Sequence, residues 1–127
     1  MKNKFLTILS IGLFALLLSC NKSGDPAPSS SFKKEDFNGT WQEDGSEASG
    51  CTQLIKIDAT YFIHGIKCGT TLTFGNGLAY TFANNSIAYS EGGSTWKLEI
   101  TTRTSTTFKA KLYGEGFLLS EPSYTKL

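Results

Sequence analysis

Histidine, cysteine and arginine are scarce in this chain: among 127 residues there are one histidine, three cysteines and a single arginine, Arg103. So few histidine and cysteine side chains leave little material for a metal site or for a nucleophile with its base. An excess of charge is also missing, because 12 basic side chains face 11 acidic ones. Neither a nucleic-acid-binding surface nor an acidic tail is indicated, and we expect no nucleic-acid partner.

One cluster has a spacing that resembles metal ligands, namely Cys51, His64 and Cys68. Structural zinc sites need four ligands with a close pair, and the only histidine is already used. His64 lies in the apolar run 61–66, where the spacing implies no nucleophile or orienting carboxylate, so a surface or strand-edge position is expected.

The glycines at 75 and 77 precede no helix and so make no phosphate loop. We expect no metal, no cofactor and no enzymatic activity.

The N-terminus has the pattern of an export signal. Lys2 and Lys4 precede an apolar run over 5–18, which is shorter than the roughly 20 residues of a membrane-spanning helix. The run ends in Leu-Leu-Ser-Cys at 17–20, which resembles a bacterial lipobox. That resemblance implies a signal peptide over 1–19, cleaved before a lipidated Cys20 that holds the protein on a membrane. The alternative is ordinary cleavage, which leaves Cys20 as a free thiol.

Export has consequences for charge, location and the two remaining cysteines. Cleavage leaves 10 basic against 11 acidic side chains. Asn21 is not the aspartate linked with retention in the inner membrane, so we expect the outer membrane, with the leaflet open. Cys51 and Cys68 form an even pair in an oxidising compartment, so a disulfide is predicted. Closing such a loop contributes about 3 kcal/mol to stability.

A polar segment follows the lipobox. Residues 21–31 consist mainly of Ser, Pro, Gly and Lys and cannot bury enough apolar surface to offset the entropy lost on ordering. We therefore expect a flexible tether over 20–36 and a folded domain over 37–127. Residues 33–36 are compatible with a short helical turn, and Phe32 and Phe37 would then plug one end of the domain.

Beyond residue 37 no helical stripe of useful length occurs, and hydrophobic residues recur with period two. In 95–101 the side chains of Trp96, Leu98 and Ile100 point one way and polar residues the other. The same alternation, with turn residues between, predicts strands near 40–44, 53–58, 60–67, 70–75, 78–83, 86–90, 95–102, 106–113 and 117–126. A break of the last strand at Pro122 is left open. Gly75-Asn76-Gly77 is expected to form a tight hairpin turn.

Alternation with one polar face is typical of antiparallel sheets. About eight short, hairpin-linked strands must hide their edges, and closure does so directly. The expected fold is an all-β, antiparallel up-and-down β-barrel of about eight strands. Strands this short leave a narrow bore that the barrel's own side chains can largely fill.

Gly39-Thr40-Trp41 begins the first expected strand. This Gly-x-Trp pattern resembles the lipocalins and the wider calycin group, in which the tryptophan closes the barrel floor. The chain over 37–127 is similar to small lipocalin-like domains of bacterial lipoproteins. An arginine on a late strand usually stacks on that tryptophan; here Lys126 is expected to take its place by a cation–π contact. The alternative for Trp41 is a core aromatic of any β domain.

The resemblance implies a binding function. A small-ligand carrier would hold an apolar molecule at the barrel mouth, with walls formed by Tyr80, Phe82, Tyr89, Trp96 and Phe108. The same aromatics are also what a small barrel needs merely to fill its core. The alternative function is a protein-interaction or inhibitor module of a surface complex, with a filled barrel and the loop 43–50 as its contact surface.

Overall fold

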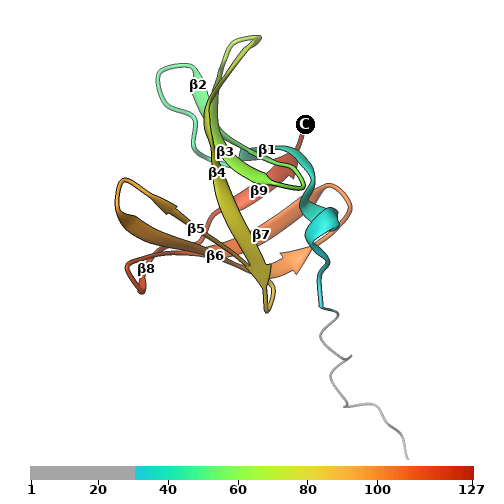
Figure 1. Ribbon diagram of the computed structural model, residues 1–127. Helices are drawn as coiled ribbons and strands as arrows, with labels where there is room; N and C mark the ends of the chain where they lie inside the picture. Colours follow the sequence, from blue (N-terminus) through green and yellow to red (C-terminus); the bar gives the residue numbers. More distant parts are fainter. Residues whose placement is uncertain (1–30) are drawn as a thin grey trace, which may run out of the picture. The chain divides into compact units, whose positions relative to one another are not determined.

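The computed structural model describes residues 31–127, so the expected signal peptide, the lipidation of Cys20 and most of the tether lie outside the described residues. Within them a short 3-10 helix, η1 (Lys34–Phe37), precedes nine strands (Figure 1). The strands are β1 (Gly39–Glu43), β2 (Cys51–Ile57), β3 (Tyr61–Cys68), β4 (Thr71–Ala83), β5 (Ser86–Glu91), β6 (Ser94–Arg103), β7 (Thr107–Gly114), β8 (Phe117–Ser120) and β9 (Ser123–Lys126). In residues 31–127 no helix has the length and apolar character of a membrane span.

Eight of the described strands close an antiparallel barrel, which confirms the expected fold class. Strands β1 to β7 pair in chain order, and β9 completes the circle by pairing with both β1 and β7. Among the described strands β8 pairs with β7 alone and stands outside the circle. The expected strand 117–126 is indeed broken at Pro122, whose carbonyl oxygen accepts the N–H of Ala110 at 3.0 Å. This break lets one edge of β7 bind two short strands in succession.

The predicted hairpin at Gly75-Asn76-Gly77 is wrong. The expected strands 70–75 and 78–83 form one continuous strand, β4, which pairs with β3 on both sides of a β-bulge. The glycines serve close packing instead of a turn. Gly77 lies opposite Ile63, and a Cβ atom there would come within 2.8 Å of the ring of Tyr61. The ring of Tyr61 therefore packs beside Gly77 at a distance that no larger residue would allow.

One end of the barrel, called the floor below, is closed by η1 and Phe32. Phe37 is fully buried and meets Phe108 edge to face, with ring centroids 5.4 Å apart. Phe32 packs on Phe37, and its N–H donates to the side chain of Asn85 at 2.9 Å. The expected helical turn and aromatic plug are thus confirmed. Packed residues begin at Phe32, so the last part of the stretch expected as tether lies against the barrel.

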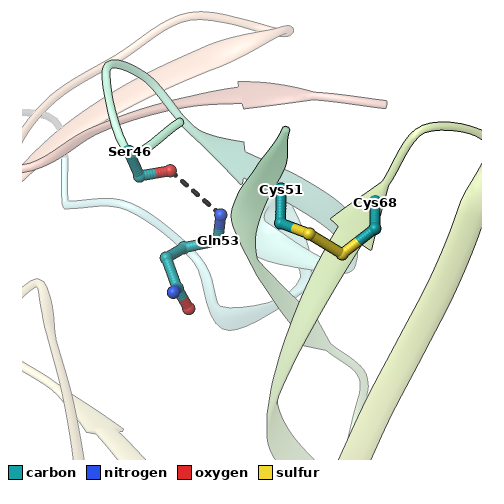
Figure 2. The surroundings of a disulfide bond; sticks show 4 residues. All are labelled: Ser46, Cys51, Gln53 and Cys68. Carbon is teal, nitrogen blue, oxygen red and sulfur yellow. Dashed lines mark hydrogen bonds between the residues drawn. A yellow bond between two sulfur atoms is a disulfide. The ribbon is translucent and has the colours of Figure 1, made fainter. Parts of the chain in front are cut away.

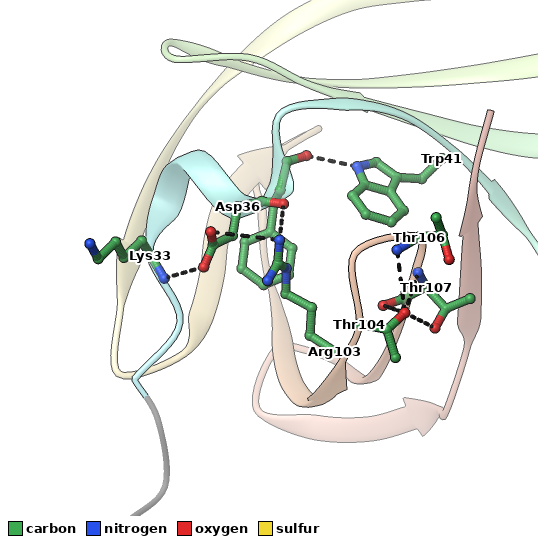
Figure 3. Close-up of polar contacts among 8 residues, drawn as sticks. Lys33, Asp36, Trp41, Arg103, Thr104, Thr106 and Thr107 are labelled. Atoms are coloured by element: carbon green, nitrogen blue, oxygen red, sulfur yellow. Dashed lines mark hydrogen bonds and ion pairs between the residues drawn. The ribbon is translucent and has the colours of Figure 1, made fainter.

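The Gly-x-Trp motif also lies at the floor (Figure 3). The indole N–H of Trp41 donates to the carbonyl oxygen of Phe37 at 2.7 Å, which ties β1 to η1. Lys126 Nζ lies 5.2 Å from the centre of the Trp41 ring, so the expected cation–π contact is confirmed. Gly39 makes room for it, because a Cβ there would lie 2.8 Å from Cε of Lys126. The motif therefore supplies Trp41 and, through Gly39, the space in which Lys126 contacts its ring.

Arg103 fixes η1 from the opposite side of the floor (Figure 3). Its Nη2 lies 3.6 Å from Oδ1 of Asp36 and donates to the carbonyl oxygen of Asp36 at 3.2 Å. Oδ2 of the same carboxylate accepts the N–H of Lys33 at 3.0 Å. The guanidinium also lies 5.7 Å from the ring centre of Phe37. The only arginine of the chain thus holds the plug and does not cover Trp41.

The predicted disulfide between Cys51 and Cys68 is confirmed (Figure 2). The two residues face each other directly on β2 and β3, at the end of the hairpin away from the floor. The bond ties the base of the loop that precedes β2. In that loop the hydroxyl of Ser46 donates to the carbonyl oxygen of Glu43 and accepts the N–H of Gln53 at 3.0 Å. The loop 43–50, expected to be a contact surface, is held by its own hydrogen bonds.

Substitution of Gly39 by alanine should destabilise the barrel. Its backbone has φ +136°, which side chains rarely adopt, and the new Cβ would displace Lys126 from Trp41. We expect a loss of about 1–3 kcal/mol in the free energy of unfolding, measured by urea denaturation. Gly75→Ala is the matched control, since its Cβ would meet only a carbonyl oxygen at 3.6 Å. Equal midpoints for the two variants would contradict this account of the motif.

Candidate binding site

The bore of the barrel is filled by its own side chains. Trp41, Phe62, Phe108 and Leu98 are each at most 1% exposed and belong to one core cluster. The rings pack on one another inside the bore: Trp41 meets Phe108 edge to face, with centroids 4.8 Å apart, and Phe108 stacks on Tyr124 at 4.6 Å. Close-packed aromatic rings leave no bore for a ligand at the floor. A binding site has to be sought on the side or at the opposite end.

Strands β4 and β5 separate along a line that is called the seam below (Figure 1). A cleft lies along this seam. The two strands pair only from Ala83↔Ser86 to Tyr80↔Tyr89, and from there β4 continues beside β3 while β5 continues beside β6. The cleft has a volume of about 600 Å³. This seam cleft is lined by Gly77, Leu78, Ala79, Tyr80, Thr81, Ala88, Tyr89, Ser90, Thr95 and Trp96. None of these side chains carries a charge.

Three of the five wall residues predicted from the sequence line the seam cleft. Tyr80 is fixed, because its hydroxyl donates to the carbonyl oxygen of Asp58 at 2.7 Å. Tyr89 is 7% exposed and stacks on Phe62 with ring centroids 4.5 Å apart. Trp96 is half-buried, and in the described residues its indole N–H is enclosed without a hydrogen-bond partner. An unpaired buried donor of this kind costs about 1–3 kcal/mol and calls for a functional explanation.

The other two predicted wall residues, Phe82 and Phe108, lie elsewhere. Phe108 is buried between Phe37, Trp41 and Tyr124, and Phe82 packs on Phe37 at 5.6 Å. Both serve the floor. Period two places all inward side chains on one face of the sheet, but it does not tell how far along the bore each one lies. The alternative reading of the aromatics as core fillers therefore holds for these two.

The inner side of the seam is bridged by an ion pair. It joins His64 on β3 to Glu91 on β5, with Nε2 of His64 3.5 Å from Oε2 of Glu91. The His64 ring contacts Phe62 and Tyr89, at 5.0 and 5.6 Å between centroids. Both side chains are about half exposed, so the contact adds little stability. His64 is exposed, as expected, and touches the residues behind the cleft.

Burial shifts the pKa of three groups, one each on β1, β5 and β9. Burial, with a smaller effect from Glu91, raises the pKa of Tyr89 to about 12. Burial also raises the pKa of Tyr124 and that of Glu43, its direct partner across β1 and β9. In residues 31–127 no three His, Cys, Asp or Glu side chains are placed to hold a metal ion.

Strand β8 exposes an apolar surface that sequence reasoning missed. Phe117, Leu118 and Leu119 are 72%, 51% and 55% exposed. Leu119 lies against Trp96 at Gly114, where an added Cβ would meet both side chains within 3.1 Å. The sequence did contain a sign of this surface, namely three apolar residues in succession. A strand with one solvent-facing side alternates apolar and polar residues, and this run does not. The β8 surface, meaning residues 117–119, thus adjoins the seam cleft through Trp96.

Fold and cleft together define a small closed antiparallel β-barrel with a filled bore and a lateral, uncharged aromatic cleft. Comparison of the chain with protein-family models, curated proteins and solved structures finds no match.

Tyrosine burial should make the barrel unstable in alkali. Between pH 10, the ordinary tyrosine pKa, and about 12, the folded protein keeps the proton of Tyr89 that the unfolded chain has lost. The free energy of unfolding should therefore fall as the pH rises through this range, by about 1–2 kcal/mol from Tyr89. Urea denaturation at stepped pH measures it. Tyr89→Phe keeps the ring and should flatten the slope; an unchanged slope would contradict the assignment.

Proposed function

We propose that the protein is a lipid-anchored binding protein of the cell envelope that holds an apolar group in the seam cleft. The observation that carries the proposal is the contrast between a filled bore and an open, uncharged cleft walled by Tyr80, Tyr89 and Trp96. Binding pockets combine aromatic walls with a few polar groups, and Ser90 and Thr95 supply hydroxyls at the rim. The ligand enters from the side of the barrel and not along its axis.

The place of action in this proposal comes from the sequence pattern at Cys20. The lipobox-like residues 17–20 would anchor the protein to a membrane, with the outer membrane favoured by Asn21. The confirmed Cys51–Cys68 bond supports an oxidising compartment, because such bonds are rare in the cytosol. A lipocalin-like origin is proposed from Gly39 and Trp41, and the contacts of that motif at the floor support it. The proposal involves no catalytic step.

Removal of the Trp96 side chain should weaken binding at the cleft. We expect Trp96→Ala to lower the occupancy of an apolar ligand at least tenfold, because the largest wall of the cleft is lost. Native mass spectrometry of the protein isolated from the envelope without refolding would detect a bound mass that leaves on denaturation. Phe117→Ala is the control, since Phe117 is exposed but does not line the cleft. Equal occupancy in both variants would rule out the seam cleft.

A second candidate function is an interaction module, and the β8 surface is the observation that favours it. Its three apolar side chains stand on a strand edge that no described strand covers. Proteins usually protect such edges with lysine or proline, and residues 117–120 contain neither. This surface replaces the loop 43–50 as the best contact candidate, because the loop is polar and held by its own hydrogen bonds.

Leu118→Lys should abolish a partner contact at β8. A charge in the centre of an apolar interface is left without its hydration, which costs several kcal/mol. Copurification from envelope extract under mild detergent would be compared between wild type, Leu118→Lys and Leu72→Lys. Leu72 is similarly exposed, at 47%, but lies on β4. A partner that is lost only in Leu118→Lys supports the module; identical behaviour of all three proteins speaks against it.

A further inference from the structure

The seam leaves unpaired main-chain groups inside the cleft. Hydrogen-bonding direction alternates along a strand, so every second residue turns its N–H and C=O to the same neighbour. Asn84 and Asn85, with φ of 50° and 57°, form a two-residue turn of the primed type. The flanking residues Ala83 and Ser86 therefore exchange hydrogen bonds across β4 and β5.

Counting from that turn identifies the residues that face the seam. On β4 they are Thr81, Ala79 and Gly77, and on β5 they are Ala88 and Ser90. Thr81 and Ala88 are paired with each other. In the ladder between β4 and β5 the pairing stops at Tyr80↔Tyr89. The N–H and C=O groups of Ala79, Gly77 and Ser90 therefore point to positions that no described strand occupies.

The β5–β6 hairpin supports the same assignment independently. Gly92 and Gly93, with φ of 60° and 85°, form its two-residue turn, so Glu91 and Ser94 exchange hydrogen bonds. Two residues further on, Tyr89 faces β6, and Ser90 must face away from β6 and toward the seam. Both hairpins thus direct free main-chain groups into the cleft.

Side chains at these positions are small and leave the backbone accessible. Gly77 has none, Ala79 has a methyl group, and Ser90 has a short hydroxyl; all three residues are exposed and line the cleft. An apolar small molecule would leave their N–H and C=O groups to water. An extended polypeptide presents complementary groups at the two-residue spacing of a strand, about 6.6 Å. The partner chemistry is therefore that of a peptide backbone.

We propose that the seam cleft binds an extended peptide segment of another protein, which adds as a strand to the β4 edge at Gly77 and Ala79 and places an uncharged, apolar side chain against Trp96. Main-chain hydrogen bonds give such a complex its affinity, and the pocket for alternate side chains gives its specificity. The absence of charge from the lining selects against an acidic or basic side chain at that position. This inference rests on the proposed function and specifies that the apolar group in the seam cleft is a side chain of a bound peptide.

The β8 edge is a weaker candidate for the same role. It is four residues long, and the described clefts do not run along it. The seam, by contrast, has one strand edge on each side and an aromatic wall between them, so a single inserted strand meets more of the protein. A peptide is also preferred to the edge of a second barrel, because the β5–β6 hairpin flanks the β4 edge and limits access to a single strand.

The test is a selection of binding peptides followed by N-methylation of the backbone of the best peptide. A phage library of random heptapeptides is selected on the protein at its natural length, isolated in mild detergent and immobilised. The best peptide is then synthesised with N-methyl groups on odd or on even residues, and each form is titrated by calorimetry. Ala79→Pro removes one seam-facing N–H, and Ala79→Val keeps it. An edge strand tolerates proline where the N–H has no partner.

The proposal expects enriched peptides with alternating apolar residues, affinity at least tenfold weaker for Ala79→Pro than for Ala79→Val, and a similar loss for only one of the two N-methylated forms. Amide exchange at Gly77 and Ala79 should slow in the complex. If Ala79→Pro does not fold, the N-methylated peptides decide alone. Equal binding of both methylated forms, or no enrichment, overturns the peptide proposal. In that case native mass spectrometry distinguishes the two proposals. A bound apolar molecule that is lost in Trp96→Ala would support the proposed function without the peptide proposal, and the absence of any bound molecule would overturn both proposals.

Discussion

Closure of the barrel by β9 is the constraint on which the rest of the structure depends. This strand has four residues, yet it pairs with β1 on one edge and β7 on the other. Lys126 at its end covers Trp41, and Tyr124 at its centre stacks on Phe108. Because closure draws eight short strands into a narrow circle, the aromatic side chains meet across the bore and fill it. Any ligand site then has to lie outside that filled core.

The seam follows from the same geometry. Strands β2, β3 and β4 rise together from the floor, and the disulfide joins β2 to β3 at the far end, whereas β5 and β6 turn away as a separate hairpin. The two groups share only the pairs from Tyr80↔Tyr89 to Ala83↔Ser86. The barrel is closed at the floor, and β4 and β5 separate beyond it. It therefore combines a rigid base with strand edges that are free along the seam. Rigid scaffolds with accessible edges are suited to binding.

Several predictions failed or stayed incomplete because local patterns have more than one structural solution. Gly75-Asn76-Gly77 resembles a hairpin turn, but glycine also permits a bulge and the close approach of Tyr61. The choice depended on the pairing of Ile63 with Gly77, a contact between residues that are distant in the chain. Likewise, the alternation that marks Phe82 and Phe108 as inward says nothing about their level in the bore. The β8 surface was missed because three apolar residues in succession read as an ordinary buried strand.

The all-β class, the closed antiparallel barrel of about eight strands, the disulfide and the plug at Phe32 and Phe37 were predictable from the sequence alone. These features follow from period-two alternation, turn chemistry and cysteine arithmetic, which are local or nearly so. The contact of Lys126 with Trp41 was expected only from the resemblance to the lipocalins. Only the tertiary structure decided where the circle closes, which aromatics fill the bore and which line a cleft. Those outcomes depend on the length over which β4 and β5 stay paired and on the two strands that share β7. Long-range pairing sets both, and no local pattern in the sequence encodes it.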